Sequence, residues 1–167
     1  VGKPHARIRP SRERLRGVSE ALDWRRIEDI ISRYMNLVDL FILCVDRDGD
    51  ANRREKLNHI ERQAAKTLPQ SCILLGENAW QEIEVWALAG FDLPNDWAWS
   101  EIRGETHAKE TYFEPFAKQR GLLSESPGGG RRSLGLEAAR RYDRIRQLCP
   151  EDVASLESRI KKWIEST

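Results

Sequence analysis

The chain contains 167 residues, of which 40% are hydrophobic and 33% are charged, and its 28 basic and 27 acidic side chains nearly cancel. A chain of this length can bury one core without metal or disulfide support, which favours a single domain. Its apolar runs fall short of the roughly 20 residues that cross a bilayer, so we expect no signal peptide and no membrane contact.

The cysteines of the chain, Cys44, Cys72 and Cys149, are odd in number and far apart. This pattern does not suit a disulfide framework and indicates buried thiols in a reducing compartment. We therefore expect a cytoplasmic protein.

Charge is distributed unevenly along the chain. Arginines concentrate in residues 7–33 and 131–146, whereas residues 77–105 are mainly acidic. Such polarity can steer a polyanion toward a protein. Pairing of helical arginines with nearby acids explains the same pattern, so basic content alone does not establish nucleic-acid binding.

The first half of the chain alternates between helical and strand-like patterns. Apolar residues at helical spacing predict a helix over 23–36, with Asp23 as its N-cap. Strand-forming residues follow at 40–45, a second helical pattern covers 53–67, and residues 71–75 predict another short strand. Strands joined by a helical crossover pair in parallel, with a right-handed connection. The sequence therefore predicts an open, mainly parallel α/β sheet flanked by helices.

The pattern after the second strand is mainly helical. We expect a helix over 79–89, whose apolar face contains Trp80, Ile83, Trp86 and Ala87, and irregular structure over 91–106.

Residues 107–167 are expected to form a helical C-terminal extension. Its predicted helices cover about 107–119, where Pro115 is a kink or break, and then 135–148 and 151–164. The Ser-Pro-Gly-Gly-Gly segment that precedes two arginines predicts a mobile loop at 124–132.

Alternating aspartates follow the first predicted strand, at Asp46, Asp48 and Asp50. The carboxyl ends of strands are where α/β sheets bind ligands. Mg²⁺ prefers oxygen ligands and needs only one or two protein carboxylates when waters and phosphates complete its coordination, which makes Asp46 and Asp48 candidate ligands. The alternative is a polar turn with Gly49 at positive φ, in which Asp50 caps the following helix.

The apolar strand and Asp46-Arg47-Asp48-Gly49-Asp50 together resemble the TOPRIM domain, the metal-binding fold of topoisomerases, primases and OLD-type nucleases. Ile83-Glu84-Val85-Trp86 is similar to the Ile-Glu-x-Trp helix of small bacterial TOPRIM-like proteins, and His107-Ala108-Lys109-Glu110 to their His-x-Lys-Glu segment. The resemblance covers about residues 36–165. It implies a single Rossmann-like TOPRIM domain over 1–167.

The resemblance also implies a function and a set of site residues. The function is Mg²⁺- or Mn²⁺-dependent phosphoryl transfer on nucleic acid by a TOPRIM-type nuclease, with bacterial defence as one setting. The implied catalytic residues are Asp46, Asp48 and Glu84, and the implied metal ligands are Asp46, Asp48, Asp50 and Glu84. An exposed helix acid is the alternative for Glu84.

Three basic residues are candidate phosphate contacts: Lys109, Arg131 and Arg132. Arginines after a glycine-rich loop can pair phosphate oxygens in bidentate fashion, although a plain surface loop explains the same residues. Sequence motifs of P-loop NTPases, Rossmann oxidoreductases, zinc fingers and α/β-hydrolases are absent.

One element departs from the TOPRIM pattern. TOPRIM domains begin with a strand that ends in a glutamate, but Glu13 and Glu20 follow no apolar strand. Either that strand precedes this sequence, or the glutamate comes from elsewhere, or the protein is not an active enzyme. A non-catalytic TOPRIM-like module that binds a protein partner or a second copy of itself is therefore the alternative function.

Overall fold

The computed structural model describes residues 15–126 and 128–166, which form a mixed α/β fold. In chain order the labelled elements are α1 (Gly17–Ala21), α2 (Trp24–Tyr34), β1 (Leu40–Val45), α3 (Arg53–Thr67), β2 (Ile73–Asn78), α4 (Glu84–Ala89), α5 (Trp99–Gly104), α6 (Glu114–Gln119), α7 (Arg131–Ala138), α8 (Tyr142–Leu148) and α9 (Ser155–Ser166). Shorter π- or 3₁₀-helical turns cover Lys109–Phe113, Ala139–Arg141 and Pro150–Ala154. Glu13 and the arginines before residue 15 lie outside the described residues.

The sheet of the described residues contains β1 and β2, which pair in parallel from Leu40 opposite Ile73 to Val45 opposite Asn78. The predicted parallel pair is therefore confirmed, with β1 and α3 at their predicted bounds. β2 begins two residues later and continues three residues further than expected. A larger Rossmann-like sheet of TOPRIM type stays a prediction.

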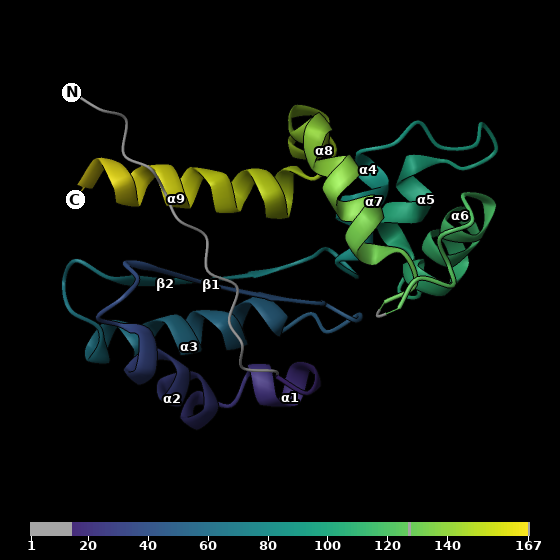
Figure 1. Ribbon diagram of the computed structural model, residues 1–167. Helices are drawn as coiled ribbons and strands as arrows, with labels where there is room; N and C mark the ends of the chain where they lie inside the picture. The colour runs from purple at the N-terminus through teal and green to yellow at the C-terminus, as the bar shows by residue number, and fades with distance from the viewer. Residues whose placement is uncertain (1–14, 127, 167) are drawn as a thin grey trace.

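Helices cover both faces of the strand pair (Figure 1). α2 and α3 pack on one face, where alternation along the strand directs Leu43 and Val45 into a core with Ile31, Leu57 and Ile60. Asp23 accepts the Arg25 N–H and caps α2, as predicted.

α9 lies along the other face of the strand pair (Figure 1). Its contact with β2 includes Arg159, which donates to the Gly76 carbonyl at 2.8 Å and to Glu61 at 2.7 Å. Arg54 from α3 also donates to Glu61 and to the buried Glu77. A charged network therefore attaches α9 to the sheet, and no residue of α9 is fully buried.

The helices α4 to α8 gather beyond the carboxyl ends of the strands (Figure 1). They enclose a second apolar core that includes Val85, Leu88, Ile102, Phe113 and Leu134. α4 and α7 approach closely because Gly90 has no side chain: a Cβ at this position would lie 2.6 Å from the Ala138 Cα.

The predicted helix over 79–89 is wrong in its first half. Residues 79–83 are not helical because the loop after β1 holds their backbone: Arg47 and Asp48 both donate their N–H groups to the Gln81 carbonyl, at 2.7 and 3.2 Å. The Gln81 side chain accepts the Gly49 N–H. α4 consequently begins at Glu84, while Trp80 and Ile83 are 37% and 38% exposed rather than part of the buried face.

The structure of the helical half differs from the sequence prediction in two other places. Residues 91–106 are not wholly irregular, because they include α5. Arg131 and Arg132 belong to α7 rather than to the predicted loop at 124–132, and a 3₁₀ turn separates α7 from α8. Helical structure is continuous from the π turn at 109–113 into α6, where Pro115 is tolerated in the first turn.

The cysteines are unpaired, and burial raises the pKa of Cys44 to about 11 and that of Cys149 to about 12. Both thiols are therefore protonated and unreactive at neutral pH. Over the described part of the chain, the helices are too short or too polar to span a bilayer.

Candidate functional site

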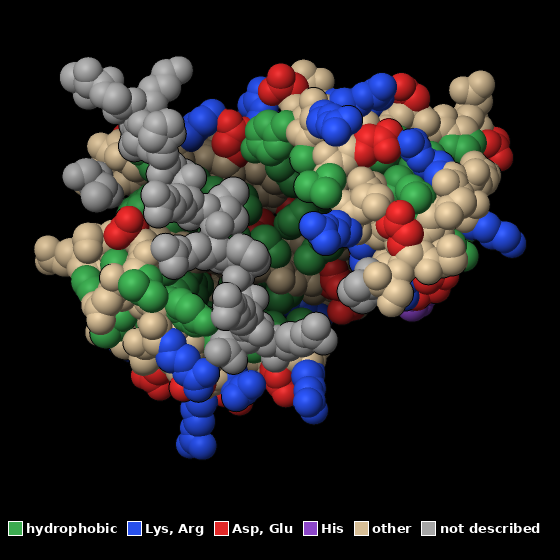
Figure 2. Space-filling model, viewed as in Figure 1, with side chains coloured by type: hydrophobic (Ala, Val, Ile, Leu, Met, Phe, Trp, Pro, Cys, Tyr) green, Lys and Arg blue, Asp and Glu red, His purple; other side chains and the backbone are tan. Residues whose placement is uncertain are grey.

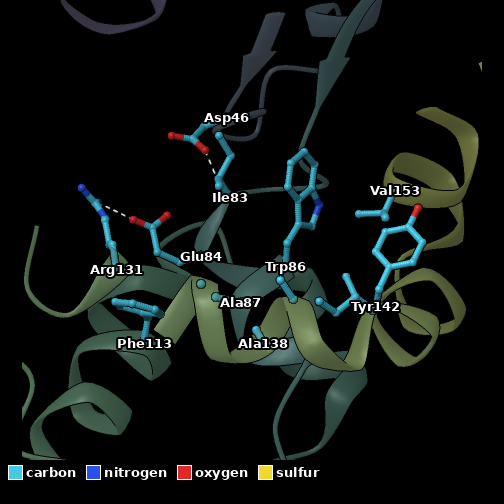
Figure 3. A pocket seen from close by; sticks show the side chains of 13 residues that line it. Asp46, Ile83, Glu84, Trp86, Ala87, Phe113, Arg131, Ala138, Tyr142 and Val153 are labelled. Atoms are coloured by element: carbon cyan, nitrogen blue, oxygen red, sulfur yellow. Dashed lines mark hydrogen bonds and ion pairs between the residues drawn. The ribbon is translucent and has the colours of Figure 1, made fainter. Parts of the chain in front are cut away.

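A cavity of about 540 Å³ lies between the carboxyl end of β1 and the helices α4, α7 and α8. On the face drawn in Figure 2, apolar side chains line a hollow between the part that contains the sheet and the helical part. Figure 3 shows Asp46, Glu84 and Arg131 on one side of the cavity and Trp86, Tyr142 and Val153 on the other. The structure thus brings together two of the predicted acids and one predicted phosphate contact.

Asp46 is the first residue after β1 and is half-buried. Its Oδ1 accepts the Ile83 N–H at 2.7 Å, which connects the end of β1 to the start of α4. Burial raises the pKa of Asp46, and the negative charges of Glu84 and Asp48 raise it further. The carboxyl group therefore lies in a place where a cation would be stabilising.

Glu84 is the first residue of α4 and is 6% exposed, so the alternative of an exposed helix acid is wrong. Its carboxylate forms an ion pair with Arg131, the first residue of α7. The two helix starts meet because Gly130 adopts a left-handed backbone with φ 82° immediately before Arg131.

The other predicted phosphate contacts lie outside the cavity lining. The Lys109 ammonium forms ion pairs with Glu110 at 3.0 Å and Glu114 at 3.6 Å. Lys109 is nevertheless close enough to Arg131 for the two positive charges to interact. Arg132 is exposed, and its side chain has no hydrogen bond or ion pair with another described residue.

Asp48 and Asp50 also lie outside the cavity lining. Asp48 adopts φ 50°, its side chain is 48% exposed, and its carboxylate is 3.8 Å from Arg53. Asp50 accepts the Asn52 N–H at 2.9 Å and pairs with Lys56 at 2.7 Å, which stabilises the start of α3. The predicted polar turn is present, with Gly49 at φ 70°.

Glu82 is an acid near the site that the sequence analysis missed. Burial raises its pKa, the Lys109 N–H that donates to it at 2.5 Å lowers it, and the charges of Glu84, Glu110 and Asp46 raise it again. The sequence feature that could have identified Glu82 is its position two residues before Glu84, directly ahead of an apolar run. Glu82 adds negative charge beside Asp46 and Glu84.

Asp152 is a second residue that sequence analysis missed. It is 1% exposed, and its carboxylate accepts hydrogen bonds from Nη1 and Nη2 of Arg103, each at 3.0 Å, and from the Trp86 Nε1–H at 2.8 Å. The same carboxylate accepts the Trp80 N–H. This network holds the backbone before α4 and the Trp86 ring in place, so its role is structural support of the cavity.

The helical arginines are largely paired with acids. Arg141 and Arg144 both contact Asp92, at 2.8 and 3.3 Å, and Arg120 contacts Glu137 at 2.8 Å. Figure 2 shows basic and acidic side chains interspersed over the visible face. These pairs support the explanation of the arginine-rich segment as charged helix surface.

Comparison with known proteins does not assign the chain to a family. Family models, curated proteins and solved structures all give no match. The site must therefore be interpreted from its own chemistry.

Across residues 15–126 and 128–166, no group of three or more histidine, cysteine, aspartate or glutamate side chains is placed to hold a metal ion. Asp46 and Glu84 instead provide two carboxylates on one cavity. Two are sufficient for Mg²⁺, which usually keeps several waters and takes further oxygens from substrate phosphates. The donor set thus fits a hard divalent cation in its chemistry.

Proposed function

We propose that the cavity binds Mg²⁺ or Mn²⁺ through Asp46 and Glu84 and acts in phosphoryl transfer on nucleic acid, as a nuclease of TOPRIM type. The observation that carries this proposal is the convergence of Asp46 and Glu84, which are 38 positions apart in the sequence, on one cavity that also contains Arg131. The raised pKa of Asp46 supports it, because burial and, to a smaller extent, the charges of Glu84 and Asp48 disfavour the ionised carboxylate, which a bound cation would stabilise.

Each side chain has a distinct part in this proposal. Asp46 and Glu84 would hold the ion, and the ion supplies charge neutralisation at a phosphoryl oxygen and activation of a water. Asp48 contributes negative charge that reaches Asp46, without lining the cavity. Asp50 is committed to the start of α3 and takes no part.

Arg131 is the group that orients the phosphate. Its side chain is 50% exposed while its partner Glu84 is 7% exposed, so the guanidinium is accessible from the cavity. A phosphate offers the same bidentate geometry as a carboxylate, and an ion on Glu84 would free Arg131 to bind it. Lys109, beside Arg131, adds positive charge.

Cleavage of nucleic acid tests the proposal directly. Wild-type protein is incubated with labelled single- and double-stranded DNA and RNA, with Mg²⁺, with Mn²⁺ or with chelator. Metal-dependent cleavage that is lost in Asp46→Asn and Glu84→Gln is expected, because both variants keep the side-chain size and remove the charge. Asp92→Asn, an exposed acid outside the cavity, is the matched control and should cleave like wild type.

A non-catalytic TOPRIM-like interaction module is the second candidate. The observation that favours it is that β1 is preceded among the described residues by α1 and α2, with no strand that ends in a glutamate. This candidate predicts a folded protein that binds a partner or a second copy of itself without cleaving nucleic acid in either metal. The cleavage assay therefore separates the two candidates.

A further inference from the structure

The cavity next to Asp46 and Glu84 is larger than a metal and a phosphate require. Its volume of about 540 Å³ is in the range of small-molecule sites, which is roughly 300–1,000 Å³. The charged groups occupy one side, and the remaining side chains of the lining are mainly aromatic and aliphatic (Figure 3). A ligand that fills it therefore needs a charged end and an apolar or aromatic body.

Two aromatic side chains of the cavity lining, Trp86 and Tyr142, have their polar atoms hydrogen-bonded to acids outside the lining. The Trp86 indole N–H donates to the buried Asp152, which is itself bound by Arg103. The Tyr142 hydroxyl donates to Glu157 at 3.2 Å. Because both polar groups are committed outside the cavity, the ring carbons are what a ligand meets. Pre-positioned aromatic rings favour a planar ligand that can stack.

We propose that the apolar part of the cavity receives one unstacked nucleobase, whose phosphate lies at Arg131 beside Asp46 and Glu84. This inference rests on the proposed function, because it identifies the unit of nucleic acid that the site would accept. A base has a π-face whatever its identity, so stacking tolerates any sequence. The lining offers few side-chain hydrogen-bond groups to read base edges. The site would therefore accept a single-stranded segment or strand end with little sequence preference.

Gly135 in α7 provides a direct way to fill the cavity. It lines the cavity, and a Cβ added there would meet no atom within 4 Å. Gly135→Leu adds a bulky side chain at the cavity wall with no clash at its Cβ. Gly135→Ala is the matched control, since it makes the same helix-favouring change with little added volume.

The test compares a nucleotide with the same sugar phosphate without its base, and with an alkyl phosphate that has an apolar but non-planar body. Calorimetry in the presence of Mn²⁺ measures the affinities of deoxyadenosine monophosphate, deoxyribose 5-phosphate and hexyl phosphate. Wild type and Gly135→Ala should bind the nucleotide about tenfold more tightly than the base-free sugar phosphate, a difference of about 1.4 kcal/mol. In Gly135→Leu the ratio of the affinity for the nucleotide to the affinity for the base-free sugar phosphate should fall to about one. Tyr142→Leu should reduce the ratio, whereas Tyr142→Phe should keep it, which gives an independent test if Gly135→Leu does not fold.

Three results would overturn the base pocket: equal affinity for the nucleotide and the sugar phosphate in wild type, an unchanged ratio in Gly135→Leu, or hexyl phosphate binding as tightly as the nucleotide. A separate Mn²⁺ titration without ligand distinguishes this inference from the proposed function. Mn²⁺ binding without a base preference rejects the pocket and keeps the metal site. A base preference that depends on position 135 without Mn²⁺ binding rejects the metal site and keeps the pocket.

Discussion

Arg131 at the start of α7 forms an ion pair with Glu84 at the start of α4, so the positive charge nearest the buried carboxylate comes from a residue 47 positions later in the chain. The pair connects the glycine-rich segment before α7 to the strand-end site. A cation at Glu84 and the Arg131 guanidinium would therefore compete for the same oxygens.

Replacing Arg131 should strengthen metal binding. Arg131→Met removes the competing guanidinium, so we expect Mn²⁺ affinity to rise severalfold and the Mn²⁺-induced increase in melting temperature to be larger than in wild type. Calorimetry and thermal melts with and without Mn²⁺ measure both quantities. Arg132→Met is the control, because Arg132 is adjacent, exposed and outside the cavity. An unchanged Mn²⁺ affinity in Arg131→Met would show that the ion pair does not compete with a metal.

The stability contribution of Asp46 should depend on pH in a defined direction. Burial raises its folded-state pKa above the ordinary value of 3.8, so the folded protein holds this proton more tightly than the unfolded chain does. The contribution of Asp46 to the free energy of unfolding therefore falls as the pH rises from about 3.8 through the raised pKa. At neutral pH the ionised carboxylate destabilises the folded protein by its full amount. Asp46→Asn keeps the oxygen that accepts the Ile83 N–H and removes the charge.

We accordingly expect Asp46→Asn to be more stable than wild type at about pH 7, with a margin that shrinks toward zero as the pH approaches 3.8. Urea unfolding at a series of pH values measures the margin. A variant that is less stable than wild type at neutral pH, or a margin independent of pH, would contradict this account of Asp46.

The close packing of α4 on α7 should not tolerate a side chain at position 90. In Gly90→Ala the new Cβ would lie 2.6 Å from the Ala138 Cα and 2.9 Å from its carbonyl oxygen. Overpacking against backbone should cost about 1–3 kcal/mol or more in the free energy of unfolding. Gly104→Ala is the control, since its Cβ would meet no atom within 4 Å. Equal stability of the two variants in urea unfolding would show that the helices separate easily.

Removing Asp152 from its network should strongly destabilise the folded protein. Asp152→Ala leaves Arg103, whose side chain is 11% exposed, without its bidentate partner, and also leaves the Trp86 Nε1–H unpaired. Breaking such a buried pair typically costs about 3–5 kcal/mol. Asp96→Ala, an exposed acid in the loop before α5, should change stability by less than about 0.5 kcal/mol. A small effect of Asp152→Ala in urea unfolding would mean that the existing ion pair between Arg103 and Glu151 is sufficient to stabilise the guanidinium.

The first half of the fold was predictable from the sequence because its signals are local. β1 is a continuous run of strand-forming apolar residues, α3 has apolar residues at helical spacing, and Asp23 caps α2 by accepting the N–H of Arg25, two residues later. The boundary at residue 84 was not predictable in this way. The apolar residues of 79–83 have helical spacing, but hydrogen bonds between the loop after β1 and Gln81 hold this segment in a non-helical conformation. A local sequence pattern does not reveal contacts between segments that are far apart in the chain.

The candidate site was predictable in part. Asp46 is marked by its position after a strand, and Glu84 by the resemblance to TOPRIM-like proteins, and both line the cavity. Asp48 and Asp50 share the spacing of Asp46, but the turn directs them toward Arg53 and Lys56. Asp152 reaches Trp86 over 66 positions, a pairing that depends on how the helices pack and has no signature in the sequence.

If Asp46 and Glu84 form a divalent-cation site, a calorimetric titration of Mn²⁺ will detect binding that depends on both carboxylates. Wild type, Asp46→Asn, Glu84→Gln and the control Asp92→Asn are titrated after circular dichroism confirms that each is folded. We expect saturable binding in wild type and Asp92→Asn, and an affinity at least about tenfold lower, or about 1.4 kcal/mol weaker, in the two site variants. No binding by folded wild type, or equal binding by all four proteins, would contradict the proposed cation site.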